Sequence, residues 1–158
     1  MFEIRRAGEA DAAALARLMN DLNVHEGKPP DAHSEASVLR DGFGPDPAFS
    51  AVIAVRDGEL VGYACFFPAY NTDLAARGLW LADLYVADPE RRHGTGRKLL
   101  AAVAAEAIRT GRESVEWAAR SENSRARAFY AALGARDENL RVLELDGEPL
   151  RRLAALAR

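Results

Sequence analysis

A turn with two closely spaced glycines carries the residues best suited to bind a ligand. The segment 80–100 reads as a strand, a short turn and the start of a helix, and Gly94 and Gly96 lie where the helix begins. The first turn of a helix has backbone N–H groups without partners, which together with the helix dipole form a site for anions. Glycines let a phosphate approach these groups closely. Three arginines add charge that suits a phosphate: Arg91, Arg92 and Arg97. A glycine turn with solvated arginines fits the same residues, so both interpretations stay open at this point.

Two common phosphate-binding patterns do not match this turn. The P-loop needs a Gly-Lys-Ser/Thr sequence at its end, which is absent, and the dinucleotide-binding pattern needs a third glycine where Leu99 stands. The ligand therefore has to be inferred from other parts of the chain.

Hydrophobic periodicity predicts the elements that must position the turn. We expect strands over residues 2–6, 49–55, 60–67, 80–86, 114–118 and 140–145, with a hairpin at Asp57-Gly58. Helices are expected around residues 15–26, 34–40, 96–110 and 123–133, and from Pro149 onward. Consecutive early strands favour antiparallel pairing, and the later alternation of strands and helices favours parallel pairing. The predicted fold class is α/β (mixed α+β), with a single mixed β-sheet flanked by helices.

Length and charge exclude several classes of protein. The 158 residues fit a single domain, residues 1–158. The net charge is −3, divided into −5 over residues 1–60 and +2 over residues 61–158, without the basic run of a general nucleic-acid binder. No apolar stretch reaches the roughly 18–20 residues of a membrane span, and the first residues lack the order of a signal peptide. The single cysteine, Cys65, excludes an internal disulfide and fits a reduced compartment, so we expect a cytoplasmic protein that binds neither nucleic acid nor membrane.

Two motifs together resemble a known family. Arg91-x-x-Gly94-x-Gly96 is similar to the R/Q-x-x-G-x-G/A signature of the GCN5-related N-acetyltransferases, the GNAT family. The segment from Asn123 through Phe129-Tyr130 to Gly134 resembles the second conserved stretch of that family, at the expected distance. Segments 39–44 and 81–86 look like the spermidine/spermine (diamine) N-acetyltransferase branch. The resemblance covers essentially the whole chain.

The resemblance implies a GNAT-like acyl-CoA N-acyltransferase fold, acetyl-CoA as co-substrate, no metal, and a homodimer formed through the last strand and helix. In that family backbone amides of the glycine turn grip the pyrophosphate. The strand before the turn holds the acetyl carbonyl and the pantetheine arm. The cofactor-binding residues it implies are Leu84, Tyr85, Val86, Arg91, Arg92, His93, Gly94, Thr95, Gly96, Arg97, Asn123, Ser124, Arg125 and Ala126. Asn123 could alternatively serve as a helix N-cap, or do both.

Acetyl transfer from a thioester to an amine needs an amine that has lost its proton, a stabilised carbonyl oxygen and a protonated leaving thiolate. Tyr130 is the candidate general acid, because a phenol has a pKa near that of a thiol and the family pattern places this tyrosine beside the coenzyme A sulfur. The alternative is that Tyr130 packs in the core. Cys65 lies in an apolar run and is expected to pack rather than react.

The acceptor amine is assigned to polar and acidic residues near the expected cleft. Asp83 lies within a strand, where a carboxylate is costly without a partner, and His25 and Glu26 end the first helix; we predict that these three bind substrate. Each could instead be a solvated polar group. His93 faces the glycine turn, and the histidines lack the spacing of metal ligands.

One departure from the diamine branch affects the mechanism. The branch usually has a glutamate just before the Asp83 position, where it handles the amine or its proton, and here that residue is Ala82. The predicted function is transfer of an acetyl group from acetyl-CoA to a primary amine of a small cationic acceptor, by direct attack in a ternary complex. The alternatives are a non-catalytic acyl-CoA-binding regulator on the same fold and an acetyltransferase of protein N-termini or lysines.

Overall fold

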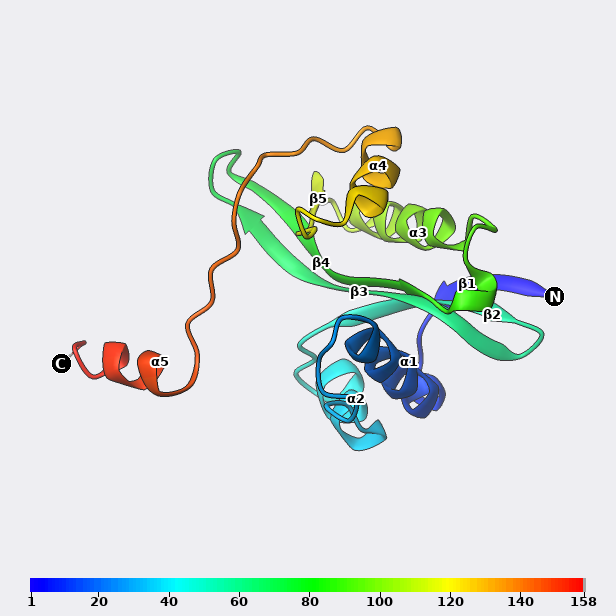
Figure 1. The fold of residues 1–158 in the computed structure, drawn as a ribbon, viewed down its shortest axis with the longest axis horizontal. Coiled ribbons are helices and arrows are strands. Elements are labelled where there is room, and N and C mark those ends of the chain that lie inside the picture. The colour runs from blue at the N-terminus through cyan, green and yellow to red at the C-terminus, as the bar shows by residue number, and fades with distance from the viewer. Residues whose placement is uncertain (158) are drawn as a thin grey trace. The chain divides into compact units, whose positions relative to one another are not determined.

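The computed structural model describes residues 1–157, which form two compact units that meet in sequence between Trp117 and Ala118. The first unit contains a five-stranded sheet in the order β1-β2-β3-β4-β5, antiparallel except between β4 and β5 (Figure 1). The predicted mixed sheet is therefore confirmed. The strands are β1 (Phe2–Arg6), β2 (Ser50–Arg56), β3 (Glu59–Asn71), β4 (Ala76–Val86) and β5 (Ser114–Glu116).

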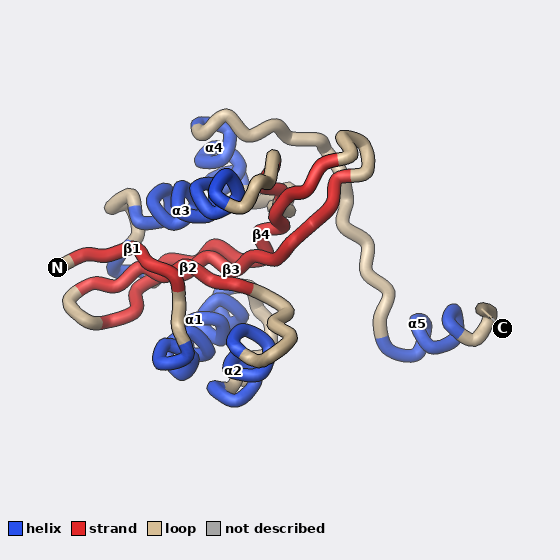
Figure 2. Tube along the Cα trace, turned by 180° about the vertical axis from the view of Figure 1, so that it is seen from behind, coloured by secondary structure: helices blue, strands red, loops and turns tan. Residues whose placement is uncertain are grey.

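Helices cover both faces of this sheet. Figure 2 shows α1 (Ala12–His25) and α2 (Glu35–Phe43) on one face and α3 (Thr95–Arg109) on the other. On the first face, apolar side chains of α1 and α2 pack on β2 and β3 in one core cluster that includes Leu15, Leu18, Val38, Ile53 and Tyr63. On the second face, Leu99 and Val103 of α3 are fully buried. The glycine turn therefore joins β4 to α3, a helix whose apolar side chains are buried on the second face of the sheet.

The hairpin between β2 and β3 follows the sequence prediction. Asp57 and Gly58 both have positive φ, 50° and 87°, as a tight two-residue hairpin turn requires. The hairpin between β3 and β4 is longer than predicted, because β3 continues to Asn71 and β4 already begins at Ala76. The side chain of Asn71 shapes that turn by accepting hydrogen bonds from the backbone N–H groups of Asp73 and Leu74, each at 3.0 Å.

A β-bulge interrupts β4 next to the predicted acceptor residue. Cys65 pairs with Asp83 and Phe66 pairs with Leu81, so the ladder skips Ala82. Because side chains alternate along a strand, Asp83 shares the sheet face of Cys65, which belongs to the core cluster under α1. The bulge leaves Ala82 as the extra residue between the two paired stretches.

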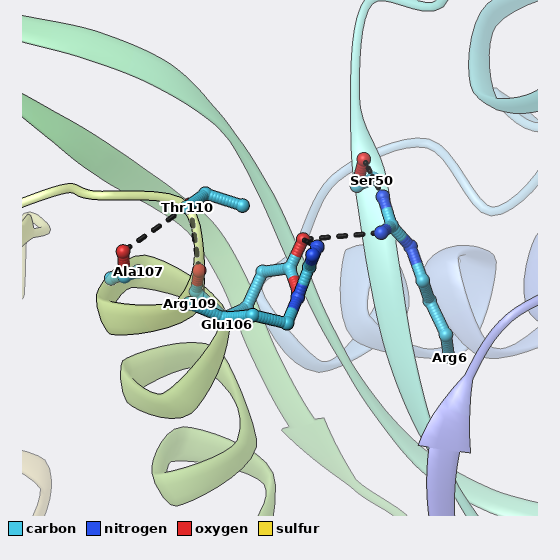
Figure 3. A network of polar contacts seen from close by, with 6 residues as sticks. All are labelled: Arg6, Ser50, Glu106, Ala107, Arg109 and Thr110. Atoms are coloured by element: carbon cyan, nitrogen blue, oxygen red, sulfur yellow. Dashed lines mark hydrogen bonds and ion pairs between the residues drawn. The ribbon is translucent and has the colours of Figure 1, made fainter.

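The C-terminal end of α3 is tied to β1 and β2 through Glu106 (Figure 3). Its carboxylate accepts hydrogen bonds from Arg6 Nη1 at 3.1 Å and from Arg109 Nε at 2.9 Å, and Arg6 Nη2 donates to Ser50 Oγ at 3.2 Å. The hydrogen bond from Arg109 is the main reason that the pKa of Glu106 is lowered. A pocket of about 250 Å³ lies beside this network, at the end of α3 far from the glycine turn along the helix.

The second unit contains α4 (Ser124–Ala132) and α5 (Gly147–Ala154). Gly134 follows α4 with a φ of 86°, the left-handed conformation of a C-terminal stop, as predicted. Pro149 lies in the first turn of α5, also as predicted. No helix among residues 1–157 is long and apolar enough to cross a membrane.

The predicted strand at residues 140–145 is wrong for this structure, because the segment has no regular secondary structure. Its apolar side chains are exposed by 85% at Leu140, 70% at Val142, 89% at Leu143 and 47% at Leu145. A strand is stabilised by pairing, and no strand within residues 1–157 pairs with this segment. The sequence pattern therefore indicates a segment that could form a strand, but residues 1–157 provide no strand that pairs with it.

Candidate active site

The glycine turn presents the free N-terminus of α3. A short 3₁₀ turn, η2 (Asp88–Glu90), follows β4, and Gly94 is the N-cap of α3 with a φ of 78°. The Lys98 N–H donates to the Gly94 carbonyl at 3.1 Å. The N–H groups of the three preceding residues have no acceptor within the helix. They converge at the positive end of a 15-residue helix, which is a site for an anion.

Open space lies over both glycines. A Cβ atom at Gly94 would meet nothing within 4 Å, and one at Gly96 would meet only Val86 Cγ2 at 3.8 Å. The fold itself therefore does not require small residues for packing at these positions. Hydrogen atoms in place of side chains leave the N–H groups accessible, which is what close approach of a pyrophosphate needs. The residues present thus fit the phosphates of acetyl-CoA.

The side chains predicted to bind phosphate differ in their exposure and in their contacts within the chain. Arg92, His93 and Arg97 are exposed around the turn. Arg91 is held in place: its Nε donates to the Val86 carbonyl at 2.8 Å, it forms an ion pair with Asp88, and its guanidinium lies 5.6 Å from the centre of the Tyr85 ring. Arg91 therefore fixes the turn, and the positive charge that is exposed to a ligand comes from Arg92 and Arg97.

Thr95 differs from the other turn residues because its side chain is buried, with 1% exposed. Its Oγ1 atom is buried and has no hydrogen-bond partner within residues 1–157. Its predicted contact with the cofactor can therefore involve the backbone N–H of the helix start, rather than a side chain that points outward.

The end of β4 has one open backbone edge. Within the first unit, β5 pairs with β4 only from Gly78 to Trp80. Neighbouring residues of an antiparallel strand turn their backbone polar groups to opposite sides. Because the Ala87 N–H donates to Val61 of β3, this alternation turns the groups of Leu84 and Val86 toward the open edge, and those of Tyr85 toward β3. Both backbone groups of Leu84 and the N–H of Val86 are thus placed to bind an extended ligand, whereas the Val86 carbonyl already accepts a hydrogen bond from Arg91 Nε.

Asp83, on the same strand, carries a carboxylate in a largely apolar setting. Its Oδ2 accepts a hydrogen bond from the Tyr63 hydroxyl at 3.1 Å. Burial raises the pKa of Asp83; the Tyr63 hydrogen bond opposes this, Glu26 adds to it, and the positive charges of Lys28 and His33 lower it. The negative charge of Glu26 is thus one of the influences on the pKa of Asp83, and the role of Glu26 in binding the acceptor stays a prediction.

The loop after α1 carries these further charges and is fixed to the helix. Asn20 Nδ2 donates to the His33 carbonyl at 2.8 Å, and the His33 N–H donates back to Asn20 Oδ1 at 3.0 Å. Glu26 and Lys28 form an ion pair. His25 is exposed at the end of α1, and its role in binding the acceptor stays a prediction.

The second unit contains the other predicted residues, around the start of α4. Asn123 is the N-cap, and its Oδ1 accepts a hydrogen bond from the Ala126 N–H at 3.1 Å, so the N-cap role is confirmed. Ser124 and Arg125 are exposed. Tyr130 is half-buried, its ring lies 5.2 Å from that of Phe129, and burial raises the pKa of its phenol. Their contacts with the cofactor stay predictions.

Three residues that contact Asp83 or influence its pKa were not predicted from the sequence: Tyr63, Lys28 and His33. Tyr63 and Asp83 are 20 positions apart and meet only because the bulge sets the register of β3 and β4. The alternation of β3 could have placed Tyr63 on the same face as Cys65, but not opposite a particular residue of β4.

Comparison with known proteins identifies the family. The model of the acetyltransferase (GNAT) family matches residues 15–135, a range that includes the glycine turn, β4 and Tyr130. The chain belongs to the GNAT family. It is therefore an acetyl-CoA-dependent N-acetyltransferase, and the resemblance seen in the sequence is confirmed.

Several curated relatives align over most of this GNAT enzyme. A thialysine N-epsilon-acetyltransferase from Bos taurus is 32% identical, with 96% of each chain covered. The L-ornithine N5-acetyltransferase NATA1 from Arabidopsis thaliana is 35% identical over 74% of this chain and 49% of its own.

A solved structure shows the same fold. An integron cassette protein from the mobile metagenome of V. cholerae superimposes with a TM-score of 0.80 at 23% identity, covering 97% of both chains. This likeness supports the predicted GNAT-like fold for the chain. Among residues 1–157, no group of three or more His, Cys, Asp or Glu side chains is placed to hold a metal.

Proposed function

We propose that this enzyme acetylates a primary amine of a small cationic acceptor by direct attack in a ternary complex with acetyl-CoA. The observation that carries the proposal is the half-buried carboxylate of Asp83 on the strand whose next residues, Leu84 to Val86, border the open backbone edge. An ammonium group bound at Asp83 would lie next to β4, the strand proposed to hold the acetyl group of acetyl-CoA. The named substrates of the relatives, thialysine and ornithine, are small amines of this type.

The chain's own groups supply binding, orientation and charge. When bound, acetyl-CoA supplies the thioester that the amine attacks. The N–H groups at the start of α3 bind the pyrophosphate, and the backbone groups of Leu84 together with the N–H of Val86 orient the pantetheine arm and acetyl carbonyl along β4. Asp83 holds the acceptor as an ammonium ion and then takes up its proton, directly or through water, before attack.

We assign the proton that the leaving thiolate needs to Tyr130. Burial raises the pKa of this phenol, so Tyr130 is protonated at neutral pH, the state that a proton donor requires. Its position in the motif from Asn123 to Gly134 supports the assignment, as does the extension of the family match to residue 135.

We also propose that the enzyme is a homodimer in which residues 140–145 pair with a second copy. Four apolar side chains of this segment are exposed in the single chain, and in an extended strand Leu140 and Val142 would lie on one face and Leu143 and Leu145 on the other. Exposed apolar surface of this kind marks an interaction site.

A thiol-release assay with acetyl-CoA tests the proposed reaction. The acceptor panel should contain thialysine, ornithine, spermidine, an aminoglycoside, free amino acids and a peptide with a free N-terminus. We expect the highest kcat/KM for a small diamine or amino-acid side-chain amine. Tight binding of coenzyme A without turnover of any acceptor would instead favour a non-catalytic acyl-CoA-binding protein, and preference for the peptide would favour a protein acetyltransferase.

A further inference from the structure

The hydroxyl group of Tyr63 contacts the carboxylate of Asp83, the residue proposed to bind the acceptor. The side chain is fully buried in the core cluster between the sheet and α1, and its Oη lies 3.1 Å from Asp83 Oδ2. The neighbouring ring on this face is Tyr85, at 6.2 Å between ring centres. Phenylalanine would fill nearly the same volume, so packing alone does not account for the hydroxyl.

The hydrogen bond has a fixed direction. Burial and the negative charge of Asp83 raise the pKa of Tyr63, so the phenol stays protonated and donates throughout the working pH range. A buried hydroxyl needs a partner, and Asp83 is the acceptor that the structure provides. The bond occupies Oδ2, and no donor within residues 1–157 bonds Asp83 Oδ1, which leaves that oxygen for a ligand.

The other groups around Asp83 do not replace this hydrogen bond. From β3, Cys65 pairs opposite Asp83, and burial raises the pKa of its thiol to about 12, so it is neutral. From the end of α1 and the loop after it, the charges of Glu26, Lys28 and His33 influence the pKa of Asp83, while its side-chain hydrogen bond within residues 1–157 comes from Tyr63. Burial disfavours the carboxylate form of Asp83, and the Tyr63 hydroxyl is the direct contact that favours it.

We propose that Tyr63 is a positioning residue for the acceptor: its hydroxyl holds the Asp83 carboxylate ionised and turned so that Oδ1 receives the ammonium group. This inference rests on the proposed function. It also gives the Asp83 carboxylate a hydrogen-bond donor from within the core, next to a position where this chain has Ala82 and the diamine branch usually has a glutamate.

The variant Tyr63→Phe removes the hydroxyl and keeps the ring. Loss of a hydrogen bond to a carboxylate raises the pKa of Asp83 further, so the acidic limb of kcat/KM for the acceptor moves to higher pH by about one unit. At pH values below the limb we expect the KM for the acceptor to be about tenfold higher in Tyr63→Phe than in the wild type. The KM for acetyl-CoA and the limiting kcat at high pH should stay within about twofold of the wild-type values. The matched control is Tyr70→Phe, the same change on an exposed tyrosine of β3, which should leave both KM values unaltered.

A double-mutant cycle separates positioning from a general structural role. In an Asp83→Asn background, Tyr63→Phe should change the acceptor kcat/KM by less than about twofold, because the group through which Tyr63 acts is gone. Equal losses in both backgrounds, or equal losses in the KM for acetyl-CoA and for the acceptor, would overturn the proposal. So would an unshifted acidic limb in Tyr63→Phe.

An NMR titration keeps the test independent of turnover. In ¹³C-labelled protein, the signal of the Asp83 carboxyl carbon is identified by its absence in Asp83→Asn. The pKa read from this signal should be about one unit higher in Tyr63→Phe than in the wild type. If the wild type acetylates no amine, the proposed function fails, and this titration still decides the role of Tyr63. If the wild type is active and the carboxyl titrates unchanged, only the inference about Tyr63 fails.

Discussion

Replacing Gly94 by alanine separates what the fold requires from what the cofactor requires. The Gly94 backbone has a φ of 78°, and a Cβ there would meet no atom within 4 Å. The expected loss of stability is therefore only the left-handed strain of a residue with a side chain, roughly 1–2 kcal/mol. For a chain of this length, that lowers Tm by about 2–8 °C.

The same Cβ should cost much more in binding, because it fills the space through which a pyrophosphate reaches the N–H groups of α3. We expect the Kd for coenzyme A to rise by tenfold or more, which is about 1.4 kcal/mol of binding energy. Isothermal titration measures this directly. Ligand at 100 times the wild-type Kd should stabilise the wild type by about 2.7 kcal/mol, and Gly94→Ala by about 1.4 kcal/mol.

Gly111 provides the control, because it lies just beyond the other end of α3 with a φ of 68° and equally open space. Gly111→Ala should lose a similar amount of stability and keep the wild-type affinity for coenzyme A. If Gly94→Ala binds coenzyme A as tightly as Gly111→Ala does, the assignment of the pyrophosphate to this turn is refuted.

Three other changes test separate parts of the molecule. Tyr130→Phe should lower kcat by about 10²-fold with the coenzyme A affinity within twofold, and a variant with full kcat in the thiol-release assay would exclude Tyr130 as the acid. Leu143→Lys should convert a dimer to a monomer of 17.2 kDa in sedimentation velocity, whereas a wild type that already sediments as a monomer contradicts the proposed pairing. Asp11→Asn removes a carboxylate that accepts two hydrogen bonds from Arg5, at 2.7 and 2.8 Å, and should cost about 1–2 kcal/mol of unfolding free energy at pH 7. Because the Arg5 hydrogen bond lowers the pKa of Asp11 in the folded state, this contribution is complete above the unfolded pKa, near 4, and disappears as the pH falls through the folded value. Urea unfolding across pH 2–7 measures it, and a pH-independent difference between the two proteins would contradict the assignment.

The sequence predicted those features that depend on neighbours along the chain. The Asp57-Gly58 hairpin, the start of α3 at Gly94 and the end of α4 before Gly134 each follow from the backbone preferences of a few adjacent residues. The acidic residue at 83 was identified for a similar reason, since a carboxylate within an apolar strand is costly and needs an explanation.

The direction of strand pairing was predicted, but features that depend on the register or extent of pairing between distant segments were not. The contact of Tyr63 with Asp83 depends on a register that a single bulge sets. The alternating segment 140–145 shows the converse: its pattern is that of a strand, but a strand forms only where an edge is available to pair with it. The open edge of β4 beyond Trp80 likewise depends on where β5 stops.

The bulge at Ala82 also bears on which substitutions this enzyme can tolerate. A residue that the ladder skips neither pairs across the sheet nor packs in its core, and Ala82 is exposed. Substitutions there leave the register of Asp83 and the packing of β4 intact, so they cost little stability. Position 82 can therefore carry acidic, neutral or larger side chains one residue from Asp83 without disturbing the sheet. If Asp83 binds the acceptor as proposed, a single substitution at position 82 would change the surroundings of the bound amine while the fold is retained.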